Sequence, residues 1–154
     1  MAAKVLYDRI KLTRMAVLQL PFGVLSALAA EIYLKCLLLL EAGQFPKTTH
    51  NLKELFMQLP RVTRIKLEQK HDEIRANHPA FVAQNDASAD PEDLDSLLEL
   101  AQESFVELRY LYEQDATRMR GSVFPLLLFS ICVRDRILEI RPGWSDIPPT
   151  FPPH

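Results

Sequence analysis

Glycine, cysteine and tryptophan are scarce in this chain of 154 residues, which has four glycines, two cysteines and one tryptophan. No Asn-Gly or Asp-Gly turn separates alternating apolar and polar residues, so β-hairpins have little support. The chain also lacks a Gly-rich phosphate loop, a Gly-x-Ser-x-Gly nucleophile elbow and a His-Glu-x-x-His metal pair. These absences argue against an all-β fold and against the enzyme classes that the three motifs mark.

The two cysteines, Cys36 and Cys132, each lie inside an apolar stretch. We expect both to be free, buried thiols rather than a disulfide, as is usual in a reducing compartment. No cysteine pair stands with histidines at the spacing of a structural zinc site. We therefore predict no metal and no other cofactor.

The net charge is -2, with 48% hydrophobic and 25% charged residues, which is typical of a soluble globular domain. Nucleic-acid binding would therefore need a local basic patch. Residues 16–40 are very apolar, but Pro21, Glu31 and Lys35 interrupt them, so no uncharged window of about 18 to 20 residues remains. No signal-peptide pattern opens the chain. We expect a cytoplasmic protein without a membrane partner.

Apolar residues recur at helical spacing along most of the chain, which predicts an all-α bundle of four to five helices. The helices are expected at residues 3–19, 24–42, 52–59, 61–77, 91–119 and 123–141, the short third one leading into the fourth. Residues 1–141 then form a single helical-bundle domain. The tail 142–154 holds five prolines, which predicts an extended segment.

Several signals locate the helix ends and inner faces. "PFG" at residues 21–23 should break the chain before the second helix, and Gly43 should end it. Asn51 and Glu54 predict a capping pair, while Asp90 and Pro91 predict the start of the 91–119 helix. The inner face of the second helix is predicted from its helical stripe, which is Leu25, Leu28, Ile32, Cys36 and Leu39. For the 91–119 helix, the inner residues are Leu94, Leu97, Leu98, Ala101, Phe105, Leu108 and Tyr112.

Glu31 and Lys35 lie one turn apart in the orientation that favours an ion pair. Their apolar neighbours predict burial, and a buried charge needs partners because leaving it unpaired costs several kcal/mol. The candidate partners are Arg109 and Tyr110 in "ELRYLYE" and His50 in "HNLKELF", with Arg109 the best partner for Glu31. Two interpretations stay open: a polar network that fixes helix packing, and a functional site.

The 61–77 segment mixes basic and acidic residues, which is typical of a solvent-exposed helix face and leaves a phosphate-contacting role open. Near the end of the last helix, Arg134 and Arg136 are expected to be exposed and to complement the helix dipole together with Arg141.

Residues 28–59, "LAAEIYLKCLLLLEAGQFPKTTHNLKELFMQL", resemble the second-helix region of HEPN-type helical domains, in which an apolar helix with Glu and Lys leads to a His-x-Leu segment. Residues 105–113, "FVELRYLYE", look like a later helix of one related subgroup that carries an Arg-Tyr pair. The resemblance covers roughly residues 20–115. It implies an up-and-down helical bundle, commonly homodimeric, with a link to nucleotides or RNA.

Many members of that family are metal-independent ribonucleases of toxin–antitoxin or phage-defence systems. The resemblance implies that an Arg and a His on a late helix, with four to six residues between them, would carry such a reaction. This chain departs from that pattern, because no His follows Arg134 or Arg136 on its last helix. Arg64 and His71 have the right separation but lie on an earlier helix, so they are only weak catalytic candidates. The positions that match the family-like segments are Glu31, Lys35, His50, Arg109 and Tyr110.

The leading functional hypothesis is a non-catalytic or degenerate HEPN-like dimer that binds a nucleotide, RNA or a partner protein. One alternative is a metal-independent ribonuclease that uses Arg64 and His71 or a site shared across a dimer. Another is a purely structural interaction protein, in which the polar network only holds helices together. The sequence leaves open whether the protein is an enzyme, and favours one that is not.

Overall fold

The computed structural model describes residues 19–43, 48–77, 93–101 and 123–146. All regular secondary structure in these ranges is helical, which confirms the all-α prediction. The elements are α2 (Gln19–Ala42), α3 (Leu52–Met57), α4 (Arg61–Asn77), α6 (Leu94–Leu100), α8 (Val123–Ile140) and the 3₁₀ turn η4 (Pro142–Asp146). The predicted helix over 3–19 and most of the one over 91–119 lie outside the described residues.

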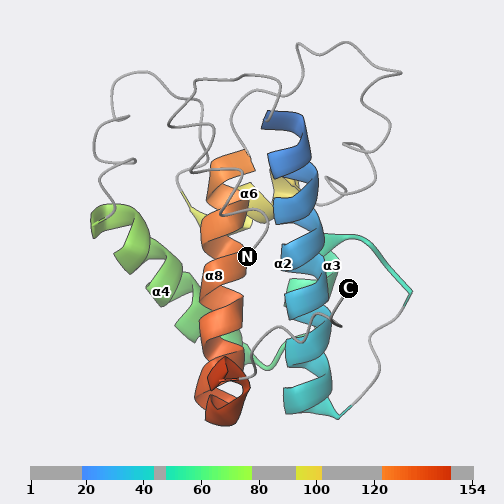
Figure 1. Ribbon diagram of the computed structural model, residues 1–154, viewed down its shortest axis with the longest axis vertical. Helices are drawn as coiled ribbons and strands as arrows, with labels where there is room; N and C mark the ends of the chain where they lie inside the picture. The colour runs from blue at the N-terminus through green and yellow to red at the C-terminus, as the bar shows by residue number, and fades with distance from the viewer. Residues whose placement is uncertain (1–18, 44–47, 78–92, 102–122, 147–154) are drawn as a thin grey trace, which may run out of the picture.

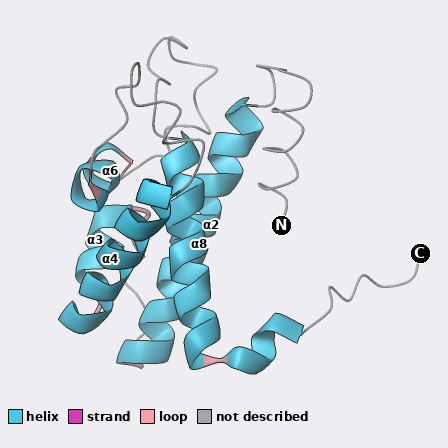
Figure 2. Cartoon of the chain, turned by 90° about the vertical axis from the view of Figure 1, so that its left-hand side faces the viewer, coloured by secondary structure: helices cyan, strands magenta, loops and turns pink. Residues whose placement is uncertain are grey.

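The two long helices α2 and α8 form the centre of the described fold, where they share its most extensive contact. Both run downward in Figure 1, from blue to cyan and from orange to red, so they are parallel. α4 lies on the other side of α8 and runs upward. In the turned view of Figure 2, α3, α4 and α6 lie together on one side of the α2–α8 pair. The up-and-down order of the whole chain stays a prediction, because connecting segments lie outside the described residues.

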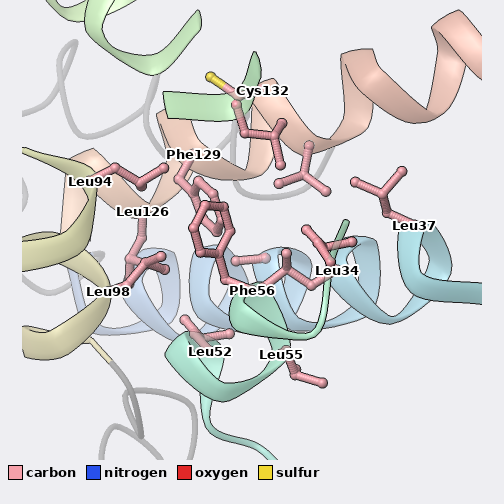
Figure 3. Packing of buried hydrophobic residues seen from close by; sticks show 14 of the residues in the cluster. Leu34, Leu37, Leu52, Leu55, Phe56, Leu94, Leu98, Leu126, Phe129 and Cys132 are labelled. Carbon is pink, nitrogen blue, oxygen red and sulfur yellow. The ribbon is translucent and has the colours of Figure 1, made fainter. Parts of the chain in front are cut away.

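One hydrophobic cluster joins these helices (Figure 3). At its centre the rings of Phe56 in α3 and Phe129 in α8 pack edge to face, with centroids 6.0 Å apart and planes at 70°. Aromatic pairs favour this geometry because the positive ring edge meets the negative ring face. The shared core anchors the short helix α3 against the α2–α8 pair, so the residues directly before α3, 48–51, lie near α2.

The predicted inner face of α2 is wrong. Ile32 and Leu39 are exposed, at 53% and 42%, and Leu25, Leu28 and Cys36 are only partly buried. The buried face is the opposite one, formed by Phe22, Ser26, Ala27, Ala30, Leu34, Leu37 and Leu38. Because α2 is apolar on nearly every side, its periodicity could not identify the face that α8 covers.

The ends of α2 agree with the sequence only in part. Residues 21–23 are helical, so "PFG" does not break the chain there. Pro21 is the third described residue of α2, and the helix continues through it. Gly43 ends the helix as predicted: its φ is +62°, and its N–H donates to the Leu39 carbonyl over 3.1 Å. Glycine adopts this left-handed conformation without steric cost.

The predicted cap of α3 is present in one direction only. The side-chain oxygen of Asn51 accepts from the N–H of Glu54 over 2.8 Å, as in a capping box. The Glu54 carboxylate does not complete the box; it accepts from the hydroxyl of Thr49 over 2.9 Å. The helix ends at Met57, two residues before the predicted end.

α6 begins and ends differently from the 91–119 helix that the sequence predicts. Its N-cap is Asp93, whose carboxylate accepts from the N–H of Ser96 over 2.7 Å, and the helix ends at Leu100. Asp93 is therefore the N-cap of α6, three residues after the predicted cap Asp90. Leu94, Leu97, Leu98 and Ala101 are buried as predicted. The predicted inner residues Phe105, Leu108 and Tyr112 lie outside the described residues.

The C-terminal helix and the cysteines follow the predictions more closely. α8 covers Val123–Ile140, one residue shorter than predicted, but Pro142–Asp146 forms a 3₁₀ turn instead of extended chain. Cys36 and Cys132 are both free thiols as predicted, but Cys36 is only partly buried. Cys132 is fully buried, and this burial raises the pKa of its thiol to about 12, so it is held protonated and inert.

α2 is also long and apolar enough to cross a membrane by length and composition alone, over Pro21–Ala42. A core helix of a soluble protein passes the same test, and 44% of the most apolar window of α2 is buried inside this fold.

Candidate functional site

A carboxylate from the middle of α2 is the centre of the candidate site. Glu31 is only 4% exposed, so a charged side chain is buried among mostly apolar neighbours on the helix. Its Oε1 accepts from the Lys35 Nζ over 2.7 Å and lies 3.0 Å from the Nδ1 of His50, which is 3.2 Å from Oε2. Because a carboxylate can only accept, we assign the hydrogen to Nδ1 of His50. Two donors therefore compensate the buried charge.

The loop before α3 holds His50 in this position. The Thr49 hydroxyl accepts from the N–H of Asn51 over 3.1 Å while it donates to Glu54. Asn51 in turn caps α3, which the Phe56 ring anchors in the core. This chain of hydrogen bonds fixes the backbone on both sides of His50, so the imidazole meets Glu31 without depending on a flexible loop.

The cluster of Glu31, Lys35 and His50, hereafter the Glu31 cluster, is buried at its carboxylate and more exposed at its two basic groups. The side chains of Lys35 and His50 are 29% and 55% exposed. Glu31 already engages both donors, so it is not an open general base. What the cluster offers to solvent is a pair of basic side chains held at fixed positions.

Of the five residues predicted for the polar network, the structure places Glu31, Lys35 and His50 together. Arg109 and Tyr110, the other two residues predicted for this network, lie outside the described residues, as does the predicted pairing of Arg109 with Glu31. The i,i+4 spacing was a sufficient signal for Lys35. His50 lies 19 residues from Glu31 in sequence, and it was only one of several candidate partners.

The weak catalytic candidates Arg64 and His71 lie on α4, two helical turns apart. Arg64 donates from Nη1 to the Sδ of Met57 over 3.1 Å. His71 is 2% exposed, and burial lowers the pKa of its imidazole despite the nearby Asp72 carboxylate. The imidazole of His71 is therefore closed off from solvent in this structure.

A second polar cluster was missed by the sequence analysis. Arg136, expected to be an exposed helix-end cation, donates from Nε and Nη2 to Oε1 of Glu41 over 3.1 and 2.8 Å, and from Nη1 to Glu139 over 3.0 Å. The Thr63 hydroxyl donates to the other oxygen of Glu41. These contacts join the ends of α2 and α8 to the start of α4. Arg134 is exposed, as predicted.

Beside Arg136, a hollow of about 430 Å³ lies between α4 and α8. Its lining carries charges of both signs, and comprises Lys66, Leu67, Gln69, Lys70, Glu73, Arg136 and Glu139. Lys70 pairs with Asp135 over 3.0 Å, so two of the three basic groups already have acidic partners. Within the described ranges, no group of three or more His, Cys, Asp or Glu side chains could hold a metal ion.

Comparison of the chain with models of protein families, with curated proteins and with solved structures finds no match in any of the three.

Proposed function

We propose that the chain is a non-catalytic, HEPN-like helical module that acts as a cytoplasmic homodimer and binds a phosphate-bearing ligand, a nucleotide or RNA, at the Glu31 cluster. The observation that carries this proposal is the arrangement of a partly exposed lysine and an exposed histidine on one buried carboxylate. Glu31 fixes the positions of Lys35 and His50 and so lowers the entropy cost of using them for binding. The same residues carry the resemblance to HEPN-like domains.

The absence of catalysis in this proposal rests on the state of the acid–base groups. Glu31 accepts two hydrogen bonds, and His71 is buried away from solvent. A general base must reach the proton that it removes, directly or through one water. Neither of these two side chains meets this requirement in the described structure. We therefore favour ligand binding over ribonuclease activity as the function.

Calorimetric titration with adenosine and guanosine nucleotides, and with a structured RNA in EDTA, tests the proposal. We expect Lys35→Gln and His50→Gln each to weaken binding roughly tenfold, the usual effect of losing one charged hydrogen bond. Lys53→Gln is the matched control, because Lys53 is a partly exposed lysine whose partners, Asp95 and Glu99, belong to another ion-pair group. Light scattering on the same samples checks for the dimer.

Each other interpretation predicts a distinct result. Cleavage of the RNA in EDTA, lost in His71→Ala, would support the ribonuclease alternative. A protein that binds neither nucleotide nor RNA contradicts the phosphate-ligand proposal and leaves the Glu31 cluster a structural network. In that case Glu31→Gln should lower the melting temperature with no ligand to lose.

A further inference from the structure

His71 is a buried histidine of α4 whose ring has an incomplete set of hydrogen bonds. Its Nε2 is buried and has no hydrogen-bond partner among the residues that the structure describes. Its Nδ1 lies 3.5 Å from Oδ1 of Asp72, at the outer limit of a hydrogen bond. A neutral imidazole can place its single hydrogen toward Asp72. An imidazolium would carry a second N–H, at Nε2, and burying this N–H without a partner is costly.

The charged groups around His71 do little to offset that cost. On α4 itself, Asp72 favours the imidazolium and Arg75 opposes it, and Asp93 at the start of α6 adds weak attraction. On α8, the carboxylates of Asp135 and Glu139 face α4. Both form ion pairs with Lys70, whose Nζ lies 3.0 Å from Asp135 Oδ2 and 3.9 Å from Glu139 Oε1. Burial is the largest effect on the ring, and it lowers the pKa of His71 below its ordinary value of 6.5.

α4 depends on few buried residues for its position. It packs against α8 and α6, yet only Thr63, Leu67 and His71 are buried among its 17 residues. Leu67 lies one turn before His71 on the same face, and the partly buried Ile74 lies one turn after it. Since His71 is the middle residue of this narrow apolar stripe, a charge on its ring acts directly on the contact between α4 and the core.

We propose that His71 is an acid-sensitive latch: protonation of its ring releases α4 from α6 and α8 while the α2–α8 pair stays folded. This inference is independent of ligand binding at the Glu31 cluster, because His71 belongs to a different helix and a different set of contacts. It gives the chain a response to acidification that resides in one side chain.

The direction of the effect follows from proton linkage. The docked form of α4 holds His71 neutral, whereas the released form exposes it and lets it bind a proton at its ordinary pKa. The stabilising contribution of docking is therefore complete above pH 6.5 and is lost as the pH falls below that value. For each pH unit between the two pKa values, the equilibrium constant for release rises about tenfold.

Amide hydrogen exchange, corrected for the intrinsic effect of pH, measures this release in the wild-type chain between pH 7.5 and 5. We expect protection of residues 61–77 to fall several-fold below pH 6.5, while protection of α2 and α8 changes little. His71→Gln replaces the imidazole by an amide that does not titrate, so the acid-dependent loss of protection should disappear. His154→Gln is the control, because it removes another histidine of the chain and should leave the loss unchanged.

Two results would overturn the latch. One is an equal acid-dependent loss of α4 protection in the wild-type protein and in His71→Gln. The other is a wild-type His71 ring that titrates near pH 6.5 by NMR while α4 stays protected. The NMR titration needs no substitution, so it decides the matter even if His71→Gln does not fold, and His71→Leu serves as a second non-titrating variant.

Discussion

Glu31 and Glu41 are the two acidic side chains of α2, and each is withdrawn from solvent with basic partners at hand. Lys35 could be assigned to Glu31 from spacing, because residues i and i+4 share one helix face. Arg136 could not be assigned to Glu41, because 95 residues separate them and only the parallel packing of α2 and α8 brings them together. Residue-level prediction therefore succeeded where the contact was local.

The Glu41–Arg136 contact should contribute measurably to stability. Arg136→Met keeps most of the apolar stem but removes three donors, leaving the largely buried Glu41 carboxylate with fewer partners. We expect the free energy of unfolding in urea to fall by about 1–3 kcal/mol. Arg134→Met, on the exposed face two residues earlier, should change it by less than about 0.5 kcal/mol. Equal effects of the two substitutions would show that Glu41 does not need Arg136.

At the scale of helices, the sequence predicted best where backbone chemistry acts locally. Gly43 ends α2 and Asn51 caps α3, because each signal depends only on the residues beside it. The buried face of α2 was not predictable from its pattern. Apolar residues surround this helix, and the choice between its two faces depends on α8, whose position the sequence of α2 does not contain.

The cap of α3 can be tested by itself. Asn51→Ala removes the oxygen that accepts from the Glu54 N–H, and we expect a loss of about 1 kcal/mol, or about 2–4 °C in the melting temperature. Asn77→Ala is the control at the end of α4, where the exposed side chain donates to the Glu73 carbonyl and should contribute little. A melting temperature that Asn51→Ala leaves unchanged would mean that core packing alone holds α3.

At the scale of the whole molecule, burial of α2 and membrane insertion of α2 are competing outcomes for one apolar helix. The fold covers one face of α2 with α8 and uses Glu41 to bind Arg136. Insertion would break these contacts and place Glu31, Lys35 and Glu41 in or beside hydrocarbon, where charged side chains are costly. The exposed Ile32 and Leu39 favour membrane insertion instead, because they form an apolar outer face of α2.

We expect the first outcome, and fractionation of expressing cells with an alkaline carbonate wash measures it. The wild-type chain should appear in the supernatant, because the core contacts of α2 outweigh its outer face. The double variant Ile32→Asp and Leu39→Asp changes only that face, so the share of protein in the supernatant should stay the same. Its melting temperature should stay within a few degrees of the wild-type value. Wild-type protein that stays in the pellet, with the double variant released, would show instead that the outer face of α2 holds the chain at a membrane and that the cytoplasmic assignment is wrong.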